Sequence, residues 1–179
     1  MLVISPLDDW FEAHFYNYIT VAAMLILYGV LFLVVENRRT TPRVTKLEQI
    51  SYRDALLIGV WQCLAIIPGT SRSGATIVGG LLLGLSRACV AEFTFYLAIP
   101  VMAGASLLKV VKFALSGAAI TGSEVAVLVT GCVVAFVVSL AAIRFLMDYV
   151  KRHNFKFFGL YRIVLGVIVL AVAAVSAIA

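Results

Sequence analysis

Charged side chains are scarce in this chain. Only 13% of its 179 residues are Asp, Glu, Lys or Arg, whereas 63% are hydrophobic. A soluble domain does not need so much apolar surface, and this composition is typical of an integral membrane protein. The basic residues lie in short segments between apolar runs and do not share one face, so the net charge of +5 does not indicate nucleic-acid binding.

Cysteines are few, and a basic N-terminal start is missing. Cys63, Cys89 and Cys132 are isolated within apolar segments, and their spacing fits neither a disulfide framework nor a metal site. We expect them to act as small apolar residues. The first seventeen residues carry three acidic side chains and no basic start, so we predict no cleavable signal peptide.

Long apolar runs dominate what is present. Four of them are long enough to span a bilayer, at residues 18–35, 87–115, 125–147 and 157–179. The sequence therefore predicts an all-α, polytopic membrane protein with about four spanning helices in a single membrane domain, 1–179.

A fifth apolar segment, residues 54–85, is interrupted by the stretch Pro68-Gly-Thr-Ser-Arg-Ser-Gly74. Pro68 pushes Ile67 out of helical geometry, so the first helix should end there. Glycines at both ends of the stretch permit sharp turns. We expect a second helix to begin at Ala75, with Ser73 or Thr70 as its cap.

The two halves of this segment are too short to span. Fourteen residues of helix rise about 21 Å and eleven about 17 Å, against a hydrocarbon core of about 30 Å. A re-entrant hairpin at 54–85, with its turn at 68–74, also keeps the basic segments at 38–53 and 151–156 on the cytoplasmic side. The turn then lies toward the outer leaflet.

Free amides at a helix start, several hydroxyls and a guanidinium together favour anion binding, and we predict a phosphate as the ligand. An arginine at such depth costs about 2.5–3.5 kcal/mol unless it is paired or hydrated. Two plainer interpretations stay open: the hydroxyls cap the helix, and Arg72 pairs with a carboxylate or with carbonyl groups.

Three motifs carry a resemblance to a known family. They are Gln62-Cys-Leu-Ala-Ile-Ile-Pro-Gly-Thr-Ser-Arg-Ser-Gly-Ala-Thr76, then Ser86-Arg87 with Ala91-Glu-Phe-Thr-Phe-Tyr-Leu-Ala-Ile-Pro100, and Tyr161-Arg162. With them the chain resembles the undecaprenyl-diphosphate phosphatases of the bacitracin-resistance family over nearly its whole length.

The resemblance implies hydrolysis of the diphosphate of the C55 lipid carrier at the outer face of the bacterial inner membrane, which recycles the carrier for cell-wall synthesis. It implies catalytic roles for Arg72, Ser71 and Ser73. It also implies diphosphate binding by Gly69, Thr70, Gly74, Thr76 and Gln62. The expected partners are a polyprenyl diphosphate lipid and the bilayer, and we also consider a homodimer.

The sequence departs from this family in one respect. Family members carry an earlier, inverted copy of the hairpin with glutamates, serines and a histidine, and nothing here matches it. We therefore expect half of an inverted-repeat architecture, a chain that corresponds to the C-terminal part of the enzyme, and no metal ligands here; a divalent cation (Mg or Ca) would be held mostly by the other half. The alternatives are a polyprenyl-phosphate flippase and an inactive remnant. A histidine-dependent lipid phosphatase is set aside because no histidine lies beside a serine turn.

Overall fold

The computed structural model describes residues 15–38, 41–116, 121–153 and 155–178. Helices dominate these ranges, in the order α2 (Tyr18–Asn37), η1 (Leu47–Gln49), α3 (Tyr52–Cys63), η2 (Leu64–Ile66), α4 (Arg72–Leu82), α5 (Arg87–Leu115), α6 (Gly122–Arg152) and α7 (Lys156–Ile178). Within the same ranges, β structure is limited to an isolated bridge between Val44 and Leu85. The helices α2, α5, α6 and α7 are long and apolar enough to cross a membrane. The predicted all-α, polytopic fold is confirmed.

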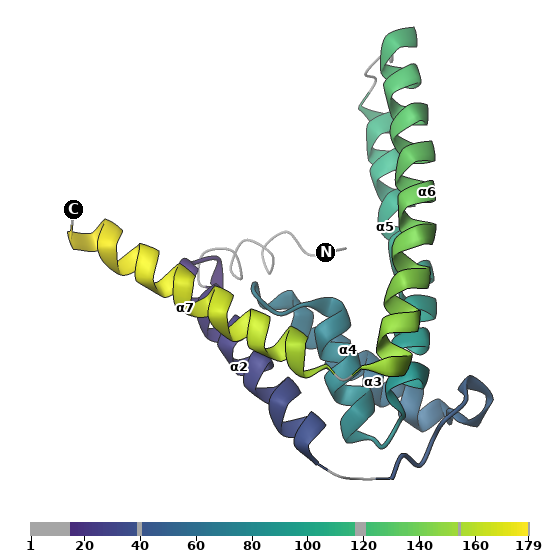
Figure 1. Cartoon of the computed structure of the whole chain (residues 1–179). Coiled ribbons are helices and arrows are strands. Elements are labelled where there is room, and N and C mark those ends of the chain that lie inside the picture. The colour runs from purple at the N-terminus through teal and green to yellow at the C-terminus, as the bar shows by residue number, and fades with distance from the viewer. Residues whose placement is uncertain (1–14, 39–40, 117–120, 154, 179) are drawn as a thin grey trace.

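Two long helix pairs diverge from a base that contains the short helices α3 and α4 (Figure 1). In one pair, α2 and α7 are antiparallel and approach very closely. A Cβ on Gly29 would lie 2.7 Å from the carbonyl oxygen of Gly159, and one on Gly159 would lie 2.8 Å from that of Gly29. Only glycine permits this contact, as is typical of helix pairs in membranes.

The interrupted segment folds as a helical hairpin. Its helices, α3 and α4, have 12 and 11 residues, which correspond to about 18 and 17 Å, too short to cross a bilayer. Ile67 is extended (φ −73°, ψ 123°) before Pro68, as predicted. Entry and exit on one side of the membrane remains a prediction.

The predicted start of the second hairpin helix was wrong by three residues. The helix begins at Arg72, not at Ala75, and its cap is Ser71 rather than Ser73 or Thr70. The Ser71 hydroxyl accepts a hydrogen bond of 3.2 Å from the Gly74 amide. This bond satisfies an amide that the first turn of a helix leaves unpaired, so the helix can begin earlier.

The third spanning helix is longer than predicted. We expected it to end at Met147 and a basic loop to follow, but α6 continues to Arg152. Lys151 and Arg152 lie in its last turn, where basic side chains interact favourably with the helix dipole. Residues 1–14, the loop residues 117–120 and Asn154 lie outside the described residues.

A buried glutamate joins three parts of the fold. The Glu36 carboxylate, at the end of α2, accepts hydrogen bonds from Nε of Arg87 at 2.9 and 3.0 Å. It also accepts one of 3.1 Å from the Phe155 amide, between α6 and α7. Its side chain is only 2% exposed. Charge-assisted bonds of this kind hold α2, α5 and the start of α7 in register.

A second ion pair fixes the start of the hairpin. The Arg43 guanidinium donates to Asp54 at 2.7 Å, and the Ser51 hydroxyl donates to the same carboxylate at 2.8 Å. The Ser51 bond and, after it, the Arg43 bond hold the pKa of Asp54 below its usual range, which keeps this carboxyl charged at neutral pH.

The topology can be tested by cysteine labelling. In a chain without its three native cysteines, a cysteine at Ser123 is expected to react with a membrane-impermeant thiol reagent in intact cells. A cysteine at His153 is expected to react only after the cells are opened, because the basic end of α6 should face the cytoplasm. Labelling of His153→Cys but not of Ser123→Cys in intact cells would reverse the assignment.

Candidate functional site

The turn between α3 and α4 is pressed against α2. Gly69 has a positive φ of 89°, and a Cβ there would lie 2.6 Å from the backbone oxygen of Val21. Both the conformation and the space therefore require glycine. Val21 is the fourth residue of α2, so the turn lies beside the N-terminal part of that helix.

Two serine hydroxyls meet where α4 begins. Oγ of Ser71 and Oγ of Ser73 are 3.1 Å apart, and Ser71 also caps the helix through the Gly74 amide. The capping interpretation is therefore correct for Ser71, and it does not exclude a ligand, because a hydroxyl oxygen has two lone pairs and one hydrogen. The helix start adds amide groups and a favourable dipole for an anion.

Thr76 lies inside the packing between α4 and α5. It is 1% exposed, and its hydroxyl is 3.0 Å from the hydroxyl of Thr94 and 3.0 Å from the Ser73 carbonyl oxygen. This position favours a role in joining the two helices over direct contact with a ligand.

Arg72 is exposed at the first position of α4. Its side chain pairs with no carboxylate in the described part of the chain, so the carboxylate pair that we considered is not found there. Gln62, near the end of α3, is half-buried. It does not border the cavity described below.

Arg162, on α7, is the site residue that sequence reasoning missed. Arginines near helix ends commonly extend to the interface. Arg162 instead turns toward the hairpin, where its Nη2 donates a 2.7 Å hydrogen bond to the carbonyl oxygen of Gly69. The guanidinium carbon lies 5.8 Å from the centre of the Tyr28 ring. An arginine within an apolar span was the available signal, because such residues are usually functional.

The turn and Arg162 share a further property. Among the described residues, two buried side-chain polar atoms lack a hydrogen-bond partner, and they are Oγ1 of Thr70 and Nε of Arg162. Buried polar atoms without partners are rare because each costs about 1–3 kcal/mol. The two atoms lie close to one place, because Arg162 donates to Gly69, the residue before Thr70.

A cavity of about 260 Å³ opens beside this place. Its polar lining comes from Ser71, Ser73, Thr94 and Arg162. Its remaining lining is mainly apolar and rich in aromatic side chains, among them Phe32, Phe95, Phe155, Phe158 and Tyr161. A small polar patch in an apolar cavity suits a ligand with a charged head and a hydrocarbon part.

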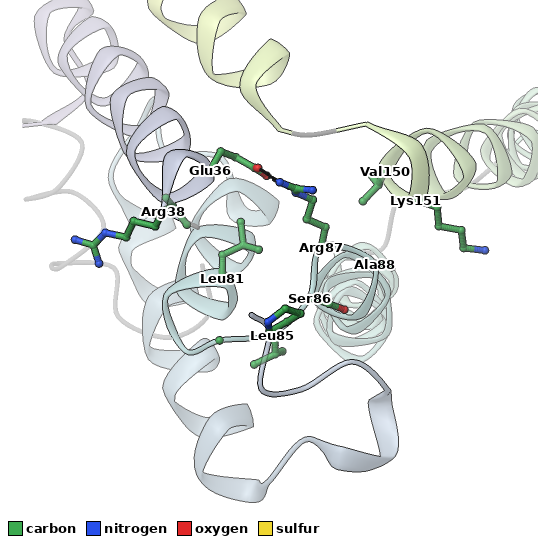
Figure 2. A pocket seen from close by; sticks show the side chains of 12 residues that line it. Glu36, Arg38, Leu81, Leu85, Ser86, Arg87, Ala88, Val150 and Lys151 are labelled. Carbon is green, nitrogen blue, oxygen red and sulfur yellow. Dashed lines mark hydrogen bonds and ion pairs between the residues drawn. The ribbon is translucent and has the colours of Figure 1, made fainter. Parts of the chain in front are cut away.

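A larger cavity, of about 360 Å³, lies at the other end of α4 (Figure 2). The Glu36–Arg87 ion pair crosses it, while Arg38 and Lys151 point away on opposite sides. Since the charges that face this cavity are already paired, it is the weaker candidate for an anion site.

A divalent cation does not fit the residues present. In the described ranges, no three side chains of His, Cys, Asp or Glu come together. The lining of the 260 Å³ cavity contains no carboxylate or imidazole. Hydroxyls and a guanidinium suit an anion, whereas Mg²⁺ and Ca²⁺ need carboxylate or carbonyl oxygens.

The fold and the turn define a class: a polytopic helical membrane protein in which the serines of a short hairpin and an arginine of α7 line a mainly apolar cavity. The family model described as Bacitracin resistance protein BacA matches residues 1–168. The chain belongs to this family, as the motifs predicted.

Similar proteins carry the name undecaprenyl-diphosphatase. The one from Desulfitobacterium hafniense is 61% identical over 166 residues, which are 91% of this chain and 59% of that protein. Those from Streptococcus mutans and Acetivibrio thermocellus are each 57% identical, over 91% and 94% of this chain and 59% and 61% of their own lengths. The chain therefore spans about 60% of the length of these relatives.

Proposed function

We propose that this chain takes part in the hydrolysis of undecaprenyl diphosphate to undecaprenyl phosphate and phosphate, at the outer face of a bacterial inner membrane. Such a reaction returns the lipid carrier to cell-wall synthesis and lowers sensitivity to bacitracin. The main support for this proposal comes from two buried polar atoms beside the serines of the turn. Oγ1 of Thr70 and Nε of Arg162 have no hydrogen-bond partner among the described residues. Family membership supports the choice of a diphosphate lipid.

The turn has the groups that phosphoryl transfer requires. In this reaction, negative charge spreads over the oxygens of the transferred phosphoryl group, and proteins act mainly by positioning and by electrostatic stabilisation. The exposed Arg72 offers a planar fork that can contact two phosphate oxygens. Ser71 and Ser73 offer hydroxyls that lie 3.1 Å apart, and the first turn of α4 leaves amides without intrahelical partners. Gly69, with its positive φ, gives the turn its shape.

The acid and base of the reaction are not among the residues that line the cavity, since these include no carboxylate or imidazole. We therefore expect the 179-residue chain in proteoliposomes to release little phosphate from undecaprenyl diphosphate. Adding the part of the Streptococcus mutans relative that this chain does not match is expected to restore turnover, measured as released phosphate.

Two other outcomes of this experiment would change the interpretation. Strong phosphate release by the chain alone would show that the described residues suffice for the chemistry. Movement of the lipid between leaflets without phosphate release, from the chain with or without the added part, would favour a flippase and contradict the proposal.

A further inference from the structure

Within the described ranges, Arg162 lacks the carboxylate partner that Arg43 and Arg87 each have. Arg43 pairs with Asp54, and Arg87 pairs with Glu36. Arg162 has no carboxylate partner among the described residues, although it is half-buried within α7. Its hydrogen bond to Gly69 occupies one of the five N–H groups of a guanidinium. A buried charge with so few partners is costly unless an anion completes it.

The free side of this guanidinium faces the start of α4. A Cβ on Gly74 would lie 3.4 Å from Nη1 of Arg162 and 3.5 Å from the Ser71 hydroxyl. The absent side chain of Gly74 thus leaves room where the arginine and the serine approach each other. Arg162, Ser71 and Ser73 all line the 260 Å³ cavity.

The two arginines of the site lie in different surroundings. Arg162 borders a cavity whose other walls are mostly apolar, whereas Arg72 is exposed and does not line that cavity. A diphosphate lipid has one phosphate attached to the hydrocarbon chain and one terminal phosphate. The apolar surroundings suit the first, and the exposed position suits the second.

We propose that Arg162 binds the phosphate that carries the polyprenyl chain, and that Arg72 binds the terminal phosphate. This assignment rests on the proposed function, because it requires a diphosphate lipid. It fixes the direction in which the substrate lies across the turn. The chain-bearing phosphate remains with Arg162 after cleavage, and the terminal phosphate leaves from the side of Arg72.

The test uses farnesyl phosphate, a short prenyl monophosphate, and measures its affinity for the full 179-residue chain in lipid nanodiscs by calorimetry. Arg162→Gln is expected to weaken binding by about 10- to 100-fold, the loss of a charged hydrogen-bonding partner. Arg72→Gln is expected to weaken the binding of farnesyl phosphate by less than about threefold. The same substitution is expected to weaken the binding of farnesyl diphosphate by about 10-fold or more. Arg144→Gln is the matched control, because Arg144 is exposed on α6 and lines no part of the cavity.

A purely structural role for Arg162 makes a different prediction. Arg162→Lys keeps the charge and can still donate to Gly69, so it is expected to melt near the wild-type temperature. If the arginine only held the turn, this folded variant would bind farnesyl phosphate like the wild type. If the fork contacts phosphate, the lysine variant is expected to bind at least about fivefold more weakly, because an ammonium cannot reproduce two parallel bonds.

The assignment is overturned if the wild type does not bind farnesyl phosphate, if Arg162→Lys folds and binds it normally, or if Arg72→Gln loses as much affinity for it as Arg162→Gln. These binding measurements need no turnover. The expected binding pattern, together with no phosphate release even after the unmatched part of the relative is added, would therefore reject the proposed hydrolysis alone. Turnover together with unchanged monophosphate binding by Arg162→Gln would reject only the assignment of Arg162.

Discussion

Arg72→Lys is expected to lose about 100- to 1000-fold in turnover when the chain is combined with the unmatched part of a relative. The change keeps the positive charge, but an ammonium cannot make the two parallel bonds of a guanidinium fork. Removing a preorganised donor from a developing charge costs typically about 2.7–4 kcal/mol, which corresponds to this loss. Phosphate release from undecaprenyl diphosphate is the measurement.

The companion variant Arg72→Ala separates catalysis from stability. Arg72 is exposed and pairs with no carboxylate within the described ranges, so its removal is expected to leave the melting temperature within about 2 °C of the wild type, as surface changes usually do. Ser123→Ala, at the exposed start of α6, is a suitable control with expected normal turnover. Well-folded Arg72→Ala protein with normal turnover would remove Arg72 from the site.

Arg87→Ala is expected to lower the free energy of unfolding by about 3–5 kcal/mol. The loss is large because the partner of Arg87, the Glu36 side chain, is only 2% exposed. The variant therefore leaves a buried carboxylate without its cation. Of the bonds described above, only the one from the Phe155 amide would remain for this carboxylate. Denaturant titration in mixed micelles, monitored by circular dichroism, measures the change.

A second substitution tests this reason. In the Glu36→Gln/Arg87→Ala double variant, the buried group is neutral and can still accept the Phe155 amide bond. We therefore expect the double variant to be more stable than Arg87→Ala alone. A double variant that is less stable than the single one would show that the loss comes from the packing of Arg87 and not from an unpaired Glu36.

Local signals in the sequence predicted most of the fold. Pro68 and Gly69 defined the turn, because the effects of proline and glycine on the backbone do not depend on distant contacts. Gly74, which we expected to form a second turn, is instead helical within α4. The predicted ends of the helices were less accurate. The start of α4 depends on which of three adjacent hydroxyl residues becomes the cap, and Ser71, Ser73 and Thr70 have similar intrinsic preferences. The end of α6 was predicted too early, because basic residues suit the last turn of a helix as well as a loop.

The candidate site was predictable only in part. The serines and Arg72 are contiguous, so their grouping followed from the sequence. The contact between Arg162 and Gly69 joins residues 93 positions apart, and it depends on how α7 crosses the hairpin. The position of Thr76 against Thr94 likewise depends on the packing of α4 and α5. No local pattern contains either contact.

Binding of the lipid phosphates by the turn at 68–74 can be measured by a titration followed by NMR. The amides of an isotope-labelled chain in micelles would be monitored as a methylene-bridged, non-hydrolysable analogue of farnesyl diphosphate is added. If the turn binds phosphate, saturable chemical-shift changes are expected at the amides of Gly69, Ser73 and Gly74, beside Arg162. Saturable shifts confined to Gly84, Ser86 and Arg87, which line the other cavity, or no saturable shift at all, would contradict it.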